Sequence, residues 1–245
     1  EGDFWEKVFT GQDCYPLVVE FHLSLKCNKR CPYCWSLSID YDKSGEPLSE
    51  HKLEQLIDEF SDNGVKEISI NGGKEPLMSS LSLKAVKFSK KRGLYVMLVT
   101  NGILVNQETQ KEMISLGIDK VRVSLDAINP EMYKEIYKGN PEECIRVMRN
   151  ISEFAALNSA QPKEKRIKIG IGVVVHKKNY NHIIEMCEFA SKNWLDFIDI
   201  RGLTEGKVEK LFTDEELAVI DRQRKEAQKG FGKNLQIDFR QESFT

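Results

Sequence analysis

The sequence predicts an α/β fold in which helices pack outside a parallel sheet. Two observations support this prediction. Short apolar runs alternate with amphipathic segments, and about six such strand-then-helix units follow one another along the 245 residues. Six units suit either an open, doubly wound sheet or a partial βα barrel. Both architectures place a ligand site at the carboxyl ends of the strands, so the residues that follow each strand are the first candidates for function.

The first strand is predicted where apolar residues recur at every second position, in the sequence LVVEFHLSL. The later strands are short apolar runs that lead into polar or glycine-containing sequences. Six segments meet these criteria, namely 17–25, 67–70, 95–99, 120–125, 168–175 and 196–201. Residues 235–239 are a further candidate strand.

The helices are predicted from apolar residues at helical spacing and from signals at their ends. Gly93 and Gly117 close two of them, Asn179 is a candidate N-cap, and Thr213 with Glu216 forms a capping box. Two others have a proline near the first turn. The expected helices are 49–60, 80–91, 107–116, 130–137, 141–157, 180–192 and 213–229.

The composition is that of an ordinary globular protein, with 40% hydrophobic and 30% charged residues. It excludes a collagen, a disordered acidic tail and a disulfide-dense mini-protein. A net charge of −2 gives no indication of a nucleic-acid partner. No apolar run approaches the roughly 18 residues of a membrane helix, and no signal peptide is evident, so we expect a cytoplasmic protein without a membrane partner.

Three of the six cysteines lie within eight residues, in the motif C-x3-C-x2-C formed by Cys27, Cys31 and Cys34. Three thiolates this close can converge on one soft metal or on an iron–sulfur centre. Three is one fewer than the ligands of a closed zinc or cubane site, which leaves a position for a distant residue or an exchangeable ligand. Two alternatives stay open: three free cysteines, or a zinc site that His22 or another residue completes.

Two further polar motifs follow predicted strands. Gly72 and Gly73 permit close backbone approach to a ligand, and Glu75 offers an anionic acceptor, although a simple turn would use the same residues. Ser124 and Asp126 are two positions apart and point the same way along an extended chain, which suits a ribose diol. The alternative for this pair is a polar strand end that caps the next segment.

The cysteine motif resembles the signature of the radical S-adenosylmethionine (SAM) superfamily, C-x3-C-x-aromatic-C, which Cys27, Cys31, Tyr33 and Cys34 match. The resemblance implies a partial (β/α)6 barrel of the radical SAM type. It also implies a [4Fe–4S] cluster with three cysteine-bound irons, and SAM chelated to the fourth iron. The position of Tyr33 in this family lies beside the adenine.

The resemblance extends to the later motifs with two departures. Lys74 replaces the third glycine of the family's G-G-G-E-P sequence, which contacts the SAM ammonium, and Ala127 replaces the glycine of its S-x-D-G sequence, where contact with the ribose or the SAM carboxylate is expected. Lys138 stands where many relatives have an arginine that faces the SAM carboxylate. The SAM contacts implied on this basis are Tyr33, Gly72, Gly73, Glu75, Ser124, Asp126 and Lys138.

The implied function is reductive cleavage of SAM to a 5′-deoxyadenosyl radical, which abstracts hydrogen from a substrate. The substrate is an unidentified peptide, sugar or aminocyclitol, as in the SPASM/twitch-like branch, and the electron donor is a protein such as flavodoxin or ferredoxin. No catalytic acid–base pair is assigned. The alternative is a non-catalytic zinc or iron–sulfur module whose loop face binds a partner.

The domain organisation expected from the sequence has three parts. Residues 1–16 form an N-terminal segment, 17–203 the radical SAM core, and 204–245 a C-terminal helix and strand that begin a further extension. Arg201 is expected to end the sixth strand and to face the cavity.

Overall fold

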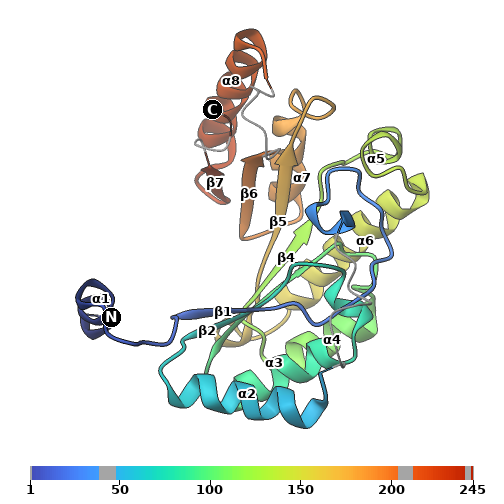
Figure 1. Ribbon diagram of the computed structural model, residues 1–245. Coiled ribbons are helices and arrows are strands. Elements are labelled where there is room, and N and C mark those ends of the chain that lie inside the picture. The colour runs from blue at the N-terminus through green and yellow to red at the C-terminus, as the bar shows by residue number, and fades with distance from the viewer. Residues whose placement is uncertain (1, 39–47, 204–211, 241–243, 245) are drawn as a thin grey trace.

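A computed structural model describes residues 2–38, 48–203, 212–240 and 244, and it contains one parallel sheet. Seven strands lie in sequence order, and each pairs in parallel with the next (Figure 1). The strands are β1 Val18–Phe21, β2 Glu67–Ile70, β3 Tyr95–Thr100, β4 Lys120–Ser124, β5 Lys168–Val175, β6 Phe197–Gly202 and β7 Gln236–Arg240.

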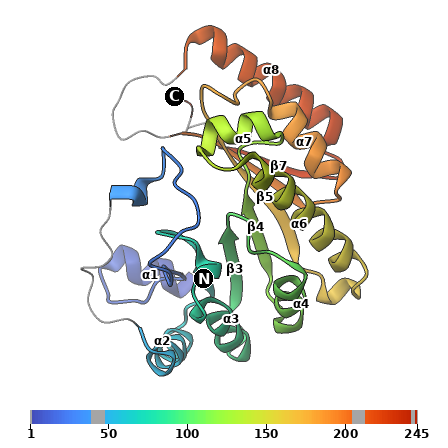
Figure 2. The same ribbon diagram turned by 90° about the vertical axis from the view of Figure 1, so that its right-hand side faces the viewer.

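The helices from α2 onward connect successive strands, and most of them cover one face of the curved sheet. Figure 2 shows α2, α3, α4, α6, α7 and α8 around its outside, whereas the loop that follows β1, drawn in blue, lies on the concave side. Within the described residues, no helix has the length and apolarity that a membrane crossing would need. The helices are α1 Gly2–Thr10, α2 Glu50–Asp62, α3 Leu81–Lys91, α4 Gln107–Leu116, α5 Pro130–Tyr137, α6 Pro141–Ser159, α7 Ile183–Lys192 and α8 Asp214–Phe231.

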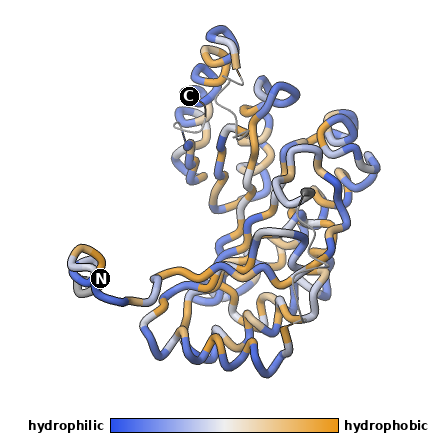
Figure 3. Tube along the Cα trace, in the orientation of Figure 1, coloured by the Kyte–Doolittle hydropathy of each residue, from blue (hydrophilic) through white to orange (hydrophobic). Residues whose placement is uncertain are grey.

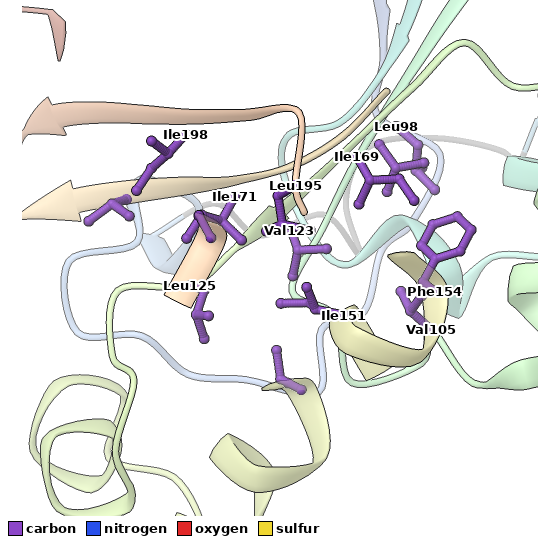
Figure 4. Close-up of a cluster of buried hydrophobic side chains, with 14 of the residues drawn as sticks. Leu98, Val105, Val123, Leu125, Ile151, Phe154, Ile169, Ile171, Leu195 and Ile198 are labelled. Carbon is purple, nitrogen blue, oxygen red and sulfur yellow. The ribbon is translucent and has the colours of Figure 1, made fainter. Parts of the chain in front are cut away.

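Alternation along the strands determines where the core forms. Side chains that face the helices are buried and apolar, and Figure 4 shows those of β3 to β6 packed against α6. Hydrophobic residues accordingly concentrate along the strands, and hydrophilic ones along the outer turns of the helices (Figure 3). Cys144 and Cys187, two of the cysteines outside the C-x3-C-x2-C motif, lie in this core.

Several local signals act as predicted. Gly117 ends α4 with φ 69°, a left-handed conformation that glycine adopts without a steric penalty. Thr213 and Glu216 form the capping box of α8. The candidate strand at 235–239 is real: β7 pairs with β6, so the C-terminal helix and strand continue the same sheet.

The prediction for Asn179 is wrong, because α7 begins only at Ile183. The Asn179 side chain is fully buried. Its Oδ1 accepts a hydrogen bond from the backbone of His176 (2.8 Å), and its Nδ2 donates to the carbonyls of Asp126 (3.0 Å) and Val174 (2.9 Å). An asparagine that joins the ends of two strands in this way is not free to cap a helix.

The first strand is shorter than predicted, since β1 ends at Phe21 rather than at residue 25. Phe21 is paired with Ile70, the last residue of β2, so the chain beyond Phe21 has no neighbouring strand to bind. The helix α1 has no counterpart among the predicted elements.

Candidate active site

A cavity of about 510 Å³ opens at the carboxyl ends of the strands and over the inner face of the sheet. Nine of the ten residues proposed from the sequence line it. They are Cys27, Cys31, Tyr33, Cys34, Gly72, Gly73, Glu75, Ser124 and Asp126. Lys138 lies elsewhere: it ends α5 with φ 54° and lines a second pocket with His176 and Lys177.

The three cysteines share one short loop after β1. The backbone N–H of Cys34 donates to the carbonyl of Cys31 (3.0 Å), and the N–H of Lys29 donates to the Cys27 sulfur (3.4 Å). The Cys34 sulfur lies 3.0 Å from the hydroxyl of Ser36. These contacts turn the loop so that all three thiols line the same wall of the cavity.

Burial makes two of these thiols, Cys27 and Cys31, weaker acids than a free cysteine. It raises the pKa of Cys31 to about 12 and also raises the pKa of Cys27. Within the described residues, no three histidine, cysteine, aspartate or glutamate side chains are arranged to hold a metal ion. The fit to an iron–sulfur cluster therefore rests on donor chemistry, because three soft sulfur ligands come from one loop and line one cavity.

Gly72 and Gly73 form a turn after β2 that needs both glycines. Their φ angles are 65° and 46°, in the left-handed region that other residues rarely adopt. A Cβ atom at position 72 would also lie within 2.5–2.6 Å of the Cδ2 and Cε1 atoms of His22. Part of the requirement for glycine therefore comes from the packing of the chain itself.

Glu75 holds two strand-end loops together. Its carboxylate is buried, with 3% of the residue exposed, and accepts hydrogen bonds from the Thr100 hydroxyl (2.6 Å) and from the backbone N–H groups of Asn101 (2.8 Å) and Leu77 (3.1 Å). Burial raises the pKa of Glu75, and these hydrogen bonds lower it. The Thr-Asn-Gly sequence after β3 thus supplies donors that fix the carboxylate.

Asp126 links the cysteine loop to the sheet. Its Oδ2 accepts from the Tyr33 hydroxyl (2.5 Å), and its Oδ1 accepts from the backbone N–H of Val174 (2.7 Å). The backbone N–H of Asp126 donates to the Tyr137 hydroxyl (2.7 Å). Burial, followed by the charge of Asp126, raises the pKa of Tyr33, so the phenol stays protonated and donates.

Sequence reasoning missed Lys29, which lies between two of the cysteines. Only 9% of this residue is exposed, and its ammonium lies over the rings of Tyr137 (4.2 Å to the centroid) and Tyr133 (4.8 Å). It has no hydrogen-bond partner among the described residues, and burial lowers its pKa. A lysine in a polar loop is normally solvated, so no sequence signal marked this one.

The floor of the cavity, formed by the inner faces of β4 to β7, carries charged residues of which the sequence predicts only one. Arg122 of β4, Asp199 and Arg201 of β6, and Arg240 of β7 all line the cavity, and Arg201 is the one expected there. The Arg122 Nη1 lies 3.5 Å from the Asp199 Oδ2, across the intervening strand β5.

Comparison with known proteins supports one family. A family model described as the Radical SAM superfamily matches residues 22–190. GTP 3′,8-cyclase of Limosilactobacillus fermentum is 28% identical over 205 residues, which cover 80% of this chain and 59% of that protein. Fe-coproporphyrin III synthase of Methanosarcina barkeri is 25% identical over 231 residues, 90% of this chain and 55% of that one. The chain thus spans little more than half the length of these relatives.

The fold is also shared with a solved structure. Streptococcus suis SuiB bound to S-adenosylmethionine aligns with a TM-score of 0.76 over 96% of this chain and 53% of its own, at 18% identity. At that identity the likeness concerns the fold alone. The predicted partial barrel is confirmed, with β7 as a seventh strand.

Proposed function

Because the chain belongs to the radical SAM superfamily, we propose that it is an enzyme that binds a [4Fe–4S] cluster and SAM in the cavity and abstracts hydrogen from a substrate. The observation that carries this proposal is the shared cavity. The cysteine loop after β1, the glycine turn after β2 and Ser124 at the end of β4 all line it. They are the three motifs that the sequence marked independently.

In this proposal Cys27, Cys31 and Cys34 hold the cluster. Three thiolates leave one coordination position for the amino and carboxylate groups of SAM. When both cofactors are bound, they supply the one-electron cleavage of SAM that yields methionine and a 5′-deoxyadenosyl radical. The protein contributes ligands, orientation and a wall that limits the access of water.

The remaining cavity residues divide into contacts and supports. Gly72 and Gly73 would present backbone groups to the SAM ammonium, and Ser124 would contact the ribose or the carboxylate. The Tyr33 ring would lie beside the adenine while its hydroxyl stays on Asp126. Asp126 and Glu75 act chiefly as supports, since both carboxylates already accept hydrogen bonds from the protein. Lys138 is left out because it lines the second pocket.

For the substrate and the electron donor, the proposal names only a class of molecule. A small molecule or a peptide is the expected substrate, and a flavodoxin- or ferredoxin-type protein the expected electron donor. The SPASM/twitch-like branch and the division into 1–16, 17–203 and 204–245 also stay predictions. In the structure, β7 from the last of these parts extends the sheet that the core begins.

The cluster assignment can be tested by replacing each motif cysteine with alanine. After anaerobic reconstitution, wild type should be brown, bind about four irons and cleave SAM when reduced. The three variants should lose iron and cleavage, whereas the matched control Cys187→Ala, which removes a buried thiol in α7, should keep both. Full iron occupancy in all three motif variants, or a colourless protein that binds zinc, would refute the proposal.

The glycine turn can be tested separately with Gly73→Val. Valine adds a β-branched side chain and disfavours the positive φ at this position. The variant should keep its iron content and lose SAM affinity in anaerobic calorimetry, with circular dichroism as the control for folding. Wild-type SAM affinity in this variant would show that the turn has no contact with SAM.

A further inference from the structure

We propose that the floor of the cavity binds a phosphate group of the substrate through Arg122, Arg201 and Arg240. This inference rests on the proposed function, because it concerns the substrate that shares the cavity with SAM. It adds a chemical class to that substrate, namely a phosphorylated small molecule.

The three arginines come together through the register of the sheet. Arg201 of β6 is paired with Arg240 of β7 and with Val174 of β5, so the two arginines lie side by side on the inner face. Arg122 of β4 shares that face and lines the same cavity. Residues from three strands therefore present guanidinium groups to one volume.

A glycine on β5 lets Arg122 reach this cluster. Gly172 lies between Ser124 of β4 and Asp199 of β6 in the register. A Cβ atom at Gly172 would lie 3.0 Å from Cδ and 3.1 Å from Nε of Arg122, so the arginine crosses the strand directly over the glycine. Beyond the glycine it meets Asp199, at 3.5 Å.

Among the described residues of β4 and β6 that line this floor, positive charges outnumber negative ones. Arg122 and Arg201 are the two cations that these strands contribute to the lining, and Asp199, which pairs with Arg122, is the one carboxylate that they contribute. Asp238 is the register neighbour of Asp199 on β7, but it is exposed and does not line the cavity. The excess of positive charge favours an anionic ligand.

The arrangement of the donors favours phosphate over a carboxylate. Guanidinium groups from β4, β6 and β7 line the cavity, so they approach a shared ligand from three strands. A phosphate group carries three strong acceptor oxygens and up to two charges, whereas a carboxylate offers two oxygens and one charge. Guanidinium groups also match phosphate oxygens in a bidentate geometry.

The guanidinium groups of Arg122 and Arg201 also have donors or charges that no described residue pairs with. The Arg122 Nε is buried without a hydrogen-bond partner among the described residues, and no ion pair of Arg201 occurs there. Burial lowers the pKa of Arg122 most, Asp199 raises it, and the charges of Arg201 and Arg240 lower it further. The cations therefore repel one another, and an anion between them would relieve the repulsion.

Arg201 and Arg240 lie apart from the motifs assigned to the cofactors. The cysteine loop and the glycine turn follow β1 and β2, whereas these two arginines belong to β6 and β7. Arg122 lies between the two sides, because it shares the inner face of β4 with Ser124. A phosphate group bound at Arg201 and Arg240 would therefore lie on the side of the cavity away from the cysteine loop.

The test measures binding of inorganic pyrophosphate to reconstituted, anaerobic protein by calorimetry. Succinate, a dicarboxylate of lower charge density, serves as the second probe. Wild type should bind pyrophosphate in preference to succinate, and Arg201→Gln should weaken the binding of pyrophosphate roughly tenfold or more. The matched control is Arg149→Gln on α6, whose exposed side chain approaches Glu153 outside the cavity; it should bind like wild type.

Four outcomes would overturn the inference: no saturable binding of pyrophosphate, equal binding by wild type and Arg201→Gln, equal binding of succinate, or a parallel loss of SAM affinity in Arg201→Gln. The last would assign the arginines to the SAM carboxylate. Iron content and SAM cleavage are measured on the same wild-type sample. Pyrophosphate binding without SAM cleavage would support the phosphate site and refute the proposed function. SAM cleavage without pyrophosphate binding would support the proposed function and refute the phosphate site.

Discussion

Replacing Gly72 with alanine should destabilise the protein for two separable reasons. The first is backbone strain, because alanine at φ 65° costs about 1–2 kcal/mol. The second is a collision with His22, whose Cδ2 and Cε1 atoms would lie 2.5 and 2.6 Å from the new Cβ. Forcing extra volume into a packed site typically costs about 1–3 kcal/mol. We therefore expect a loss of about 2–5 kcal/mol in the free energy of unfolding.

Gly117→Ala separates the two contributions. Gly117 has a similar φ of 69°, but a Cβ added there would meet no heavy atom within 4 Å apart from its chain neighbours, so only the strain applies. Its expected cost is about 1–2 kcal/mol. In a His22→Ala background the collision disappears, and Gly72→Ala should then cost no more than Gly117→Ala.

The assay is equilibrium urea denaturation of the metal-free proteins, followed by circular dichroism. The double-mutant cycle between Gly72 and His22 isolates the collision energy. The reasoning would be refuted if Gly72→Ala matched Gly117→Ala to within about 0.5 kcal/mol, or if removal of His22 restored nothing.

Three more predictions concern the surroundings of the cysteine loop. Tyr33→Phe leaves a buried oxygen of Asp126 without its donor and should cost about 1–3 kcal/mol in urea denaturation; an unchanged midpoint would contradict the link. Lys29→Met removes a buried ammonium that has no hydrogen bond to the described residues. A cation–π contact stabilises a buried ammonium by only about 2 kcal/mol, which is less than the cost of burying it, so the metal-free protein should become more stable. A lower urea midpoint would show that the contacts with the tyrosine rings dominate. Burial lowers the pKa of His176, so the unfolded chain binds the proton more tightly, and stability should fall as the pH drops through about 6.5 towards the lowered folded value. His176→Gln should lose less stability than wild type over that pH interval, and an equal loss in the two proteins would count against this assignment.

The order of the elements could be predicted because apolar residues recur at regular spacing wherever one face of a helix or strand is buried. Strands such as β5 are buried on the helix side, and α4 ends at a glycine whose conformation the residue type itself indicates. The cysteine loop was also predictable, since its three cysteines are close in sequence. Their position at the end of a strand then indicated the side of the sheet on which the site lies.

The contacts that support the site could not be predicted, because they join residues far apart in the chain. Tyr33 bonds to Asp126 across 93 positions, and Glu75 bonds to Thr100 across 25. A period reports which face is buried, but not which partner a polar side chain finds there. Asn179 shows the same limit: its type suits a helix cap, and only the fold reveals that two strand ends use it.

Alternate residues of β5 face opposite sides of the sheet and have different surroundings. Its helix-facing positions, Ile169, Ile171 and Val173, belong to the core, whereas its inner positions include Gly170 and Gly172. The two glycines differ in what lies above them: Phe197 packs over Gly170, whereas Gly172 lines the cavity. A single methyl group at Gly172 would press on Arg122 without touching the helix-facing side. The size of the side chain at position 172 therefore sets the shape of the cavity floor, and the helix-facing residues of the same strand set the packing of the core.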